Sequence, residues 1–564
     1  MTGGAALVAS VALRAWLRAG LALAASSCLS AGDAQRLSMA MPSANVPFVG
    51  AAGTLAEPRG DQGIIDVREY GITPEASTCS PGWMRLIADL STRNPRAHHE
   101  VRFGPGIYRF DSPIFISTSN LSIIGASSTG AQATVLRFSK SLYQSIPFLK
   151  SEYGDSLAQQ WSWRGGMLWI QRNTPGRIAQ RAPDAKASVS SLSSHAFELP
   201  SPADAVGVSV GDVVSLTHRL ALEDAVGIAG HAAVVGHASF ASWPFVQEPG
   251  AVMLRQRYRV RDVVYDANRQ ATRVSVDRPI RSVLTRMRES STSSVYLERA
   301  DEVIDSVSVR HLAIEFDNDT APMRQHLQED GYNALFVRNG YDVSIEHVVM
   351  RNVDSAVILE STSGSTVGNL TIEGRRKAHH GISLREQSHE NLIDRFSISA
   401  NVLHGISVQD LSSGNVFSRG VMSAGTFDSH RGMPFDNVRT EIVITPWGSA
   451  GGASGPLVGR RMVNWNVEIR WPKDAWGGDP KAKRRLAREA IITGSQWYVM
   501  GALVGIRGAE PQPDSLPWEL PPGDKGTIVA DWGKVPDPPN LYEAQKAWWR
   551  SASAAWRAGT LTVK

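Results

Sequence analysis

The stretch HHGISLREQSHENLIDRF, residues 379–396, is followed by LHGISVQDLSSGNVFSRG, residues 403–420. The tetrapeptide His-Gly-Ile-Ser therefore occurs twice, beginning at His380 and again at His404. An asparagine follows each histidine at the same distance, at Asn391 and Asn415. A chain that repeats a histidine, a glycine and an asparagine at one spacing is built from successive units of similar structure.

The repeat extends on both sides of these two units. Four apolar runs with the same alternation start at Asn333, Ser355, His380 and His404, so the spacing from each run to the next is nearly constant. Each unit holds two or three short runs and has no helical period. The sequence therefore predicts a coil of parallel strands with one turn per repeat, in which successive turns lie about 4.8 Å apart.

A second series, of asparagines, keeps nearly the same spacing: Asn369, Asn391, Asn415 and Asn437. We expect these four residues to lie in one column at a tight bend. There each amide would hydrogen-bond to the turns above and below, which satisfies polar groups that the coil buries.

The composition indicates a globular protein with a substantial core, since 42% of the 564 residues are hydrophobic and 20% are charged. The net charge is +4 and the isoelectric point is about 9.0, which suits an anionic partner as well as an ordinary solvated surface. No block of like charge indicates binding to nucleic acid. No internal apolar run is long enough to predict a transmembrane segment.

The N-terminal segment 1–34 is predicted to be a signal peptide. Arg14 and Arg18 precede a short apolar stretch of small residues, and plausible cleavage sites follow Ala31 and Ala34. The sequence thus predicts export to the periplasm or the medium, with a lipid anchor at Cys28 as the less favoured alternative. Removal of this segment would leave one cysteine, Cys79, and hence no internal disulfide.

Four further segments follow the signal peptide. Residues 62–160 are predicted to be the first part of the coil, with a helix over 81–95. An inserted β-rich module of antiparallel hairpins is expected at 165–300, and the main coil with its active site at 301–445. Residues 446–564 hold ten of the 16 tryptophans and are expected to cap the coil, with a closing helix over 541–558.

The repeat also predicts which side chains leave the coil. Ile382 and Leu384 alternate with Gly381, Ser383 and Arg385, so the first pair should face the interior and the other three the outside. Small outward residues would let a polymer lie close to the backbone, or they would accommodate a packed loop. A mixed polar row is expected at the end of the strands: Arg338, Glu360, Arg385 and Gln409.

His380 and His404 should stack roughly 5 Å apart on successive turns. Neighbouring imidazoles lower each other's pKa, which keeps a neutral base available near pH 7, although satisfied core histidines are the alternative. Other candidate residues lie on the same or adjoining turns: Asp354, Glu386, Asp410, Asp428, His430 and Arg431. No metal ion or cofactor is assigned, because histidines on successive turns lack an i,i+4 ligand spacing and nothing specifically indicates calcium.

The segments IIDVREYGI, FGPGIYRF and LSIIGASSTGAQATVLRF resemble the N-terminus of the pectate-lyase-like right-handed parallel β-helix superfamily. Together with the repeat, the resemblance covers about 62–160 and 300–445. It implies an all-β protein whose coil is right-handed and whose substrate is a carbohydrate.

HGISL and HGISV are similar to the Gly-His-Gly-Ile-Ser-Ile motif of polygalacturonase-type hydrolases, which implies an active-site role for the histidine. The aspartate pair of those enzymes reads Asp354-Ser355 here, and Asn333 stands where a third aspartate is expected. Their Arg-Ile-Lys motif is absent, but His430-Arg431 offers a cation nearby.

The favoured function is a lyase that cleaves an acidic polysaccharide by β-elimination. Its base would be His380 or His404, its neutralising cation Arg385 or Arg431, and its acid Tyr332 or Tyr341. A glycoside hydrolase is the first alternative, in which Asp354 acts with Asp410, Glu386 or Asp428. A non-catalytic carbohydrate-binding protein is the second. The residues expected to contact the polysaccharide are Arg338, Glu360, Glu386, Asp410, Asp428 and Trp447.

Overall fold

The computed structural model describes residues 46–54, 62–146, 161–172, 187–188, 191–192, 195–200, 207–220, 228, 253–281, 295–299, 302–317, 329–429, 432–445, 459–471, 500–509 and 528–557. The predicted signal peptide lies outside these residues, as do His430, Arg431 and Trp447. Within the described chain, no helix has both the length and the apolar composition to span a membrane.

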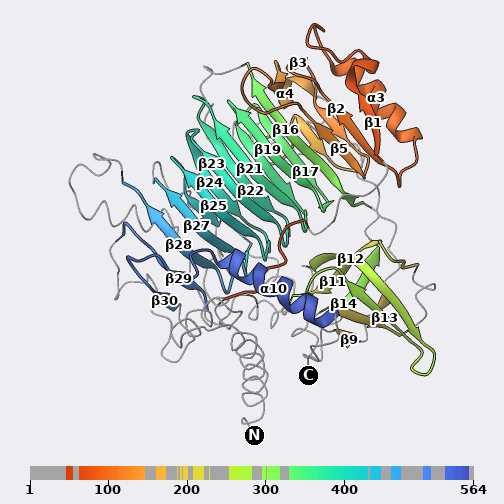
Figure 1. The fold of residues 1–564 in the computed structure, drawn as a ribbon, viewed down its shortest axis with the longest axis vertical. Coiled ribbons are helices and arrows are strands. Elements are labelled where there is room, and N and C mark those ends of the chain that lie inside the picture. Colours follow the sequence, from red (N-terminus) through yellow and green to blue (C-terminus); the bar gives the residue numbers. More distant parts are fainter. Residues whose placement is uncertain are drawn as a thin grey trace.

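Two long parallel sheets form the body of the molecule (Figure 1). Sheet A contains, in spatial order, β1 (Gln62–Asp66), β2 (His98–Arg102), β5 (Leu121–Ile124), β16 (Val307–Phe316), β19 (Ser344–Arg351), β21 (Thr366–Glu373), β23 (Leu392–Ile398), β25 (Val416–Met422), β27 (Val438–Ile444), β28 (Val463–Ile469), β29 (Ala502–Val504) and β30 (Ile528–Ala530), with β3 (Gly106–Phe110) and β6 (Thr134–Phe138) joined beside β16. Sheet B contains β4 (Ile114–Ile116), β7 (Leu168–Ile170), β17 (Asn333–Arg338), β20 (Ser355–Glu360), β22 (Ala378–Arg385), β24 (Val402–Val408) and β26 (Phe427–Ser429).

The strands confirm the predicted parallel coil. The register pairs Asn333 with Ser355, Ser355 with His380, and His380 with His404, as the repeat predicts. Because β7 pairs with both β4 and β17, the first part of the coil runs past 165. Strands β28 to β30 continue sheet A, so the coil also runs past 445.

The core lies between the two sheets and is built from stacked apolar side chains, such as Ile382 and Ile406 of sheet B and Ile398 and Met422 of sheet A. One end of this core is closed by α3 (Ser80–Thr92), whose Trp83, Leu86 and Leu90 are buried against it. This helix confirms the apolar spacing predicted over 81–95. Short segments complete this part of the chain: η1 (Val67–Tyr70), α4 (Leu142–Ser145) and the pair β15 (Ile304–Asp305) and β18 (Gly340–Tyr341).

The predicted outward direction of Gly381 is wrong. A Cβ on Gly381 would lie 2.9 Å from Ile398 Cδ1, and one on Gly405 would collide with Met422 Cε, so both positions face the core. The preceding turns carry Ala334 and Ala356 in this row, both buried in the same core. The residues of this row are small because side chains of sheet A approach them closely. They therefore do not form a surface on which a substrate could lie.

The asparagine column is confirmed for three of its four members. The side-chain amide of Asn391 donates to Asn415 Oδ1 at 2.9 Å, and that of Asn415 donates to Asn437 Oδ1 at 2.9 Å. Asn369 was predicted wrongly, because Ser365 stands in the column one turn earlier and its backbone NH donates to Asn391 Oδ1 at 3.0 Å. This turn is longer than its neighbours, so an alignment at a nearly constant spacing misplaced the asparagine.

Asn369 instead belongs to a bend that recurs in the strands of sheet A from β16 to β28. At this bend one residue per turn has a left-handed backbone conformation, with φ between 51° and 58°: His311, His347, Asn369, Arg395, Arg419, Glu441 and Asn466. The strand pairing is interrupted at these positions, which lets each strand turn a corner while the next turn repeats the same geometry.

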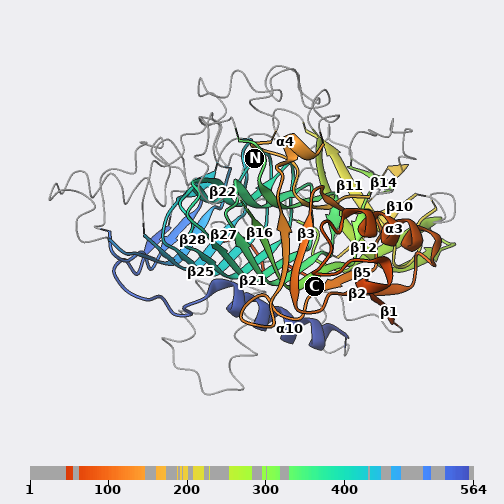
Figure 2. The same ribbon diagram turned by 90° about the horizontal axis from the view of Figure 1, so that it is seen from above.

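The inserted module is an antiparallel sheet, as predicted, and lies beside the coil (Figures 1 and 2). Its order is β8 (Ala187–Ser188), β14 (Val295–Arg299), β11 (Val213–Arg219), β12 (Met253–Asp266), β13 (Ala271–Val276), β10 (Ala196–Leu199) and β9 (Ser191–Leu192). Its core continues into the coil, since Leu411, Met433 and Phe435 pack within the same apolar cluster.

Two arginines of the module also enter the coil. Arg281 Nε lies 2.7 Å from Glu390 Oε1 and Nη1 lies 3.2 Å from Asp436 Oδ2, and all three side chains are buried. A Cβ on Gly414 would collide with the Arg281 guanidinium, so this glycine provides the room for it. Arg278 is buried alongside and pairs with Asp277 at 3.2 Å.

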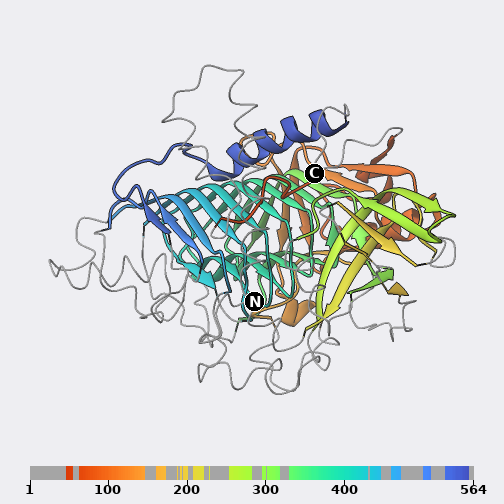
Figure 3. The ribbon, with the colours of Figure 1, turned by 90° about the horizontal axis from the view of Figure 1, so that it is seen from below.

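The closing helix is confirmed as α10 (Leu541–Arg557), but it does not cover the end of the coil. It runs along the flank of sheet A toward the inserted module (Figures 1 and 3). Asn540, at its start, donates to Ser418 Oγ at 3.0 Å, and Trp549 stacks on His195 of the module with ring centroids 5.2 Å apart. Gln545 accepts a hydrogen bond from the Val49 NH, which ties residues 46–54 to the helix.

Candidate functional site

Two polar clusters lie on the face of sheet B that is turned away from the core. Both clusters contact Trp163, which belongs to segment 161–166, a segment that forms neither helix nor strand. The indole ring lies 5.2 Å from the His380 ring and 5.2 Å from the Arg385 guanidinium carbon. This segment therefore covers the strands from which both clusters arise.

The first cluster contains three buried histidines: His379, His380 and His404. The predicted stacking is confirmed, because the His380 and His404 ring centroids are 5.0 Å apart. His379 lies face to face with His380 at 4.0 Å. The backbone NH groups of both residues donate to Asp354 O, at 2.7 and 3.3 Å, which turns two consecutive side chains toward the same region.

Carboxylates flank this histidine cluster. Glu329 Oε1 lies 2.8 Å from His379 Nδ1, and Ser162 donates to the other carboxylate oxygen. Burial alone would raise the pKa of Glu329, but the contact with His379 outweighs it and the pKa is lowered. Asp428 Oδ2 lies 3.7 Å from His404 Nδ1 and accepts a hydrogen bond from Ser407 at 2.9 Å.

Asp354 lies at the edge of this cluster and holds backbone in place. One of its oxygens accepts from the Gly331 and Tyr332 NH groups, at 3.1 and 2.9 Å, and the other accepts from Arg376 Nε at 2.7 Å. Burial raises the pKa of Asp354, and the nearby Arg376 opposes that rise. Both oxygens are thus used in contacts between turns.

The two tyrosines considered as acids occupy different places. Tyr332 is buried under the guanidinium of Arg376, which lies 4.7 Å from its ring centroid. Tyr341 is buried at the contact with the inserted module, where its hydroxyl donates to Asp277 at 2.7 Å. Tyr341 is therefore not brought to the face of sheet B that carries the clusters.

The second cluster is the polar row expected at the ends of the strands. The register pairs Arg338 with Glu360 and Glu360 with Arg385, which confirms three of the four predicted members of the row. Arg338 Nε lies 3.1 Å from Glu360 Oε1. Arg164, which the repeat gave no reason to select, lies 3.4 Å from Glu360 and 2.6 Å from Glu386, so its guanidinium joins the two carboxyl groups.

The surroundings separate the pKa values of these two carboxyl groups. Burial, followed by the charge of Glu386, raises the pKa of Glu360 to about 7. Burial would also raise the pKa of Glu386, but its ion pair with Arg164 lowers it below the usual value. Near neutral pH, Glu360 can therefore hold a proton while Glu386 is ionised.

The remaining residues of the row have fixed partners. Arg385 donates to Trp163 O, and its burial lowers the pKa of the guanidinium despite the neighbouring carboxylates. Glu386 and Asp410 occupy equivalent bend positions on successive turns, with φ of 46° and 52°. The structure thus brings together Arg338, Glu360, Arg385 and Glu386, and the described part of the chain does not place His430, Arg431 or Trp447.

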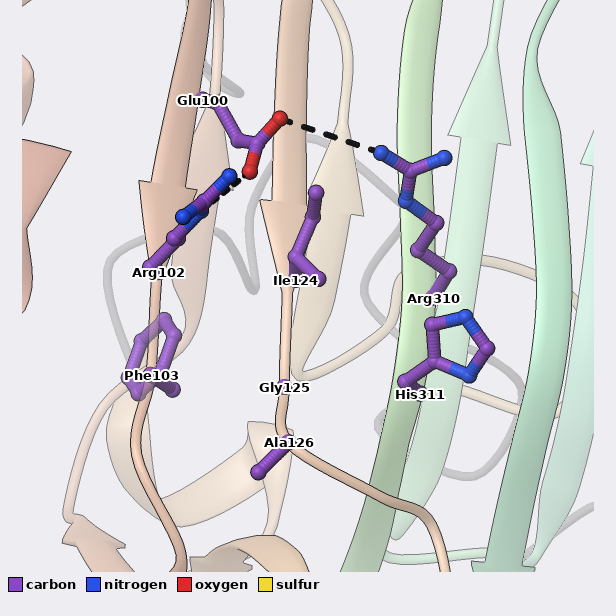
Figure 4. A pocket seen from close by; sticks show the side chains of 8 residues that line it. All are labelled: Glu100, Arg102, Phe103, Ile124, Gly125, Ala126, Arg310 and His311. Carbon is purple, nitrogen blue, oxygen red and sulfur yellow. Dashed lines mark hydrogen bonds and ion pairs between the residues drawn. The ribbon is translucent and has the colours of Figure 1, made fainter. Parts of the chain in front are cut away.

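A surface pocket of about 440 Å³ lies on sheet A (Figure 4). Its lining residues come from β2, β5 and β16 and the turns after them: Glu100, Arg102, Phe103, Ile124, Gly125, Ala126, Arg310 and His311. Glu100 pairs with Arg102 and lies 3.9 Å from Arg310. None of the residues predicted for the site lines this pocket, and its charged side chains are paired with one another.

Comparison with known proteins supports the architecture. The model of the family described as "Right handed beta helix region" matches residues 286–434. A search among curated proteins finds no match. The family match and the strand arrangement show that the chain is an all-β protein built around a right-handed parallel β-helix.

Three solved structures are similar at low identity. The Gp54 tailspike of Acinetobacter baumannii bacteriophage AP22, solved with a capsular saccharide, is 10% identical with a TM-score of 0.25, covering 72% of this chain and 69% of its own. An exopolygalacturonase from Thermotoga maritima is 8% identical, with a TM-score of 0.30 and coverages of 85% and 88%. The catalytic domain of a GH87 α-1,3-glucanase is 8% identical, with a TM-score of 0.20 and coverages of 64% and 94%.

Proposed function

We propose that this right-handed parallel β-helix protein is an enzyme that hydrolyses an anionic polysaccharide, with Glu360 as the acid and Glu386 as the base or nucleophile. The observation that carries the proposal is the pair of carboxyl groups held by one guanidinium, with pKa values driven apart by burial and by Arg164. Two titratable groups whose surroundings separate their pKa values are the arrangement that acid and base catalysis at one site requires.

The chemistry needs one proton donor and one ionised carboxylate. Glu360 would protonate the glycosidic oxygen as the bond from that oxygen to the anomeric carbon breaks. Glu386 would either take a proton from the attacking water or attack the anomeric carbon itself. In the second case water would then hydrolyse the glycosyl ester, with Glu360 as the base. Arg164 contacts both groups and belongs to a segment without regular structure, so a substrate can displace its side chain from between them.

The charge of the cluster favours an anionic substrate. The side chains of Arg164 and Arg338 are 33% and 34% exposed, so two guanidinium groups reach the solvent beside the carboxyl pair. Guanidinium groups bind carboxylates and sulfates through paired hydrogen bonds. The isoelectric point of about 9.0 agrees with an anionic partner, and a polysaccharide outside the cell agrees with the predicted export.

Cleavage of a uronate-containing polysaccharide by β-elimination is the second candidate. The partly exposed guanidinium groups of Arg164 and Arg338 favour it, because such a cation would neutralise the uronate carboxylate while a neighbouring base removes the adjacent proton. The predicted roles of His380 or His404 as the base, and of Arg385 as the cation, belong to this candidate.

The test is to incubate the purified protein with a panel of acidic and neutral polysaccharides. New reducing ends without the absorbance of an unsaturated product would support hydrolysis, whereas that absorbance would favour β-elimination. We expect Glu360→Gln and Glu386→Gln each to lower turnover by roughly 10²- to 10⁴-fold while the circular dichroism spectrum is unchanged. Glu346→Gln, on sheet A, is the matched control and should retain full turnover. Binding of a polysaccharide without any cleavage would contradict the proposal and favour a binding protein.

A further inference from the structure

We propose that His379, His380 and His404 form a binding site for one divalent transition-metal ion, for which zinc is the best match. Each of the three histidines offers a ring nitrogen, these nitrogens all lie within 4.8 Å of one another, and all three residues are buried. The inference does not depend on the proposed polysaccharide cleavage, since it concerns the affinity of these side chains for an ion.

The backbone holds the three side chains in position for a shared ligand. Both NH groups of the His379–His380 pair bond to Asp354 O, and His380 is in register with His404 on the next strand. Nitrogens that bind one tetrahedral zinc lie about 3.3 Å apart, given Zn–N distances near 2.0–2.1 Å. Rotation of the stacked rings about their side-chain bonds would bring the nitrogens to that separation without any change in the strands.

The carboxylates beside the rings determine which nitrogen faces the ion. Glu329 lies against Nδ1 of His379 and Asp428 is near Nδ1 of His404, which leaves the Nε2 atoms to bind. Metal-bound histidines commonly donate their other ring NH to a carboxylate, which orients the ring and strengthens it as a ligand. Glu329 is itself held by Ser162, and the two carboxylates would offset the charge of a buried cation.

The ligand type limits the choice of metal. Three imidazoles suit zinc, cobalt, nickel or copper, whereas calcium and magnesium prefer oxygen ligands. A site with three histidines also leaves a position for water or for a substrate atom. No metal was assigned from the sequence because an i,i+4 helical spacing was absent, but a parallel coil brings ligands together from neighbouring residues and successive turns.

A second pair of histidines provides the matched control. His311 and His347 stack at 4.9 Å, similar to the 5.0 Å of His380 and His404, but they lie in the bend of sheet A. His347 has a positive φ of 55°, which asparagine tolerates well. The variants His404→Asn and His347→Asn therefore remove comparable side chains, one inside the proposed site and one outside it.

The experiment uses the full chain after treatment with a chelator, titrated with zinc or cobalt chloride. We expect one ion per chain by elemental analysis, a rise in melting temperature with zinc, and the visible absorption of tetrahedral cobalt. His404→Asn should abolish the cobalt absorption. Glu329→Gln, which leaves all three histidines in place, should weaken zinc binding roughly 10- to 100-fold. His347→Asn should bind zinc and cobalt with the same affinity as the unaltered protein.

Three results would overturn the proposal: no uptake of zinc or cobalt by the folded protein, binding unaffected by His404→Asn, or an equal loss in His347→Asn. If His404→Asn fails to fold, the cobalt titration of Glu329→Gln tests the proposal instead. An affinity for cobalt equal to that of the unaltered protein would then count against the metal site. None of these measurements uses enzyme activity, so failure of the metal site and failure of the proposed hydrolysis are separate outcomes.

Discussion

Glu360 has a buried carboxyl group with charged neighbours on several sides. Arg338 and Arg164 pair with it, Arg385 lies on the next turn, and Glu386 shares Arg164 with it. Burial and the charge of Glu386 outweigh the three cations, and the pKa rises from 4.5 to about 7. The folded state therefore binds a proton at this residue at pH values where the unfolded chain has released it.

This pKa predicts a pH dependence of stability. Because the pKa is higher in the folded state, the contribution of Glu360 is fully present below about pH 4.5 and is lost as the pH rises through about 7. Glutamine resembles the protonated form, so Glu360→Gln should match the unaltered protein near pH 4 and exceed its stability near pH 8. The difference should be a few kcal/mol, since one pKa unit corresponds to about 1.4 kcal/mol.

Chemical denaturation of both proteins across that pH range measures the effect. The relevant quantity is the difference between the two unfolding free energies, because other buried groups affect both proteins alike. A difference that stays constant from pH 4 to pH 8 would show that folding does not raise the pKa of Glu360.

The sequence predicted which residues share a row and that Ile382 and Leu384 face the core, but it assigned the wrong direction to the row of Gly381. The row of Arg338, Glu360 and Arg385 follows from the repeat alone, and so does the stacking of His380 on His404. Gly381 was assigned to the wrong face because strict alternation ignores the interruption of pairing beside it. Arg164 and Glu329 lie outside the repeat, so only the folded chain brings them to the site. His379 could have been selected from the sequence only because it directly precedes His380.

The asparagine column determines how the turns of the coil stack. In Asn415 the amide donates to Asn437 Oδ1 and to Ser388 O, and its oxygen accepts from the backbone NH and the amide of Asn391. Every one of these groups is buried. One side chain thus satisfies polar groups on the turn before it and on the turn after it, which is why the column tolerates little besides asparagine or a small hydroxyl residue such as Ser365.

Asn415→Ala should therefore destabilise the protein by about 2–4 kcal/mol, because it leaves several buried donors and acceptors without partners. Asn369→Gly is the control. It removes the same side chain from the exposed bend, where glycine accepts the φ of 51°, and should change stability by less than about 0.5 kcal/mol. Equal losses in the two variants, measured by denaturant unfolding, would show that the column has no special role.

The inserted module and the coil share one apolar cluster and a set of buried ion pairs. Arg281 crosses from the module to Glu390 and Asp436 on neighbouring turns of the coil. Removal of one partner from a buried ion pair typically costs about 3–5 kcal/mol, because the remaining charges stay buried without compensation. The two parts should therefore unfold together in the unaltered protein.

Arg281→Met should uncouple them. Calorimetry of the unaltered protein should show the module and the coil melting in one transition, while the variant should show an earlier, separate transition of the module. Arg269→Met is the control within the same module, because Arg269 is exposed and pairs only at the surface, with Glu198. A single transition at an unchanged temperature in Arg281→Met would contradict this account of the docking.

At the scale of the whole molecule, the sequence predicted the parallel coil, the inserted antiparallel sheet and the two helices α3 and α10. It did not predict that the coil extends to β30 or that α10 lies along the flank of sheet A. The repeat is regular only where turn lengths are similar, and it ends where long connections separate β27, β28 and β29. The position at which a helix docks depends on contacts with side chains that are distant in sequence. The periodicity of the repeat does not predict such contacts.

The bond between Val49 and Gln545 has a consequence for the order in which the chain folds. These residues are separated by 496 positions, and the Tyr542 hydroxyl reaches Ala52 across 490. Contacts between such distant residues form late, since the whole intervening chain must first be compacted. During synthesis, residues 46–54 must therefore wait for their partner helix until α10 has left the ribosome. This part of the fold can be assembled only after both segments, 46–54 and α10, have reached the place where the chain folds.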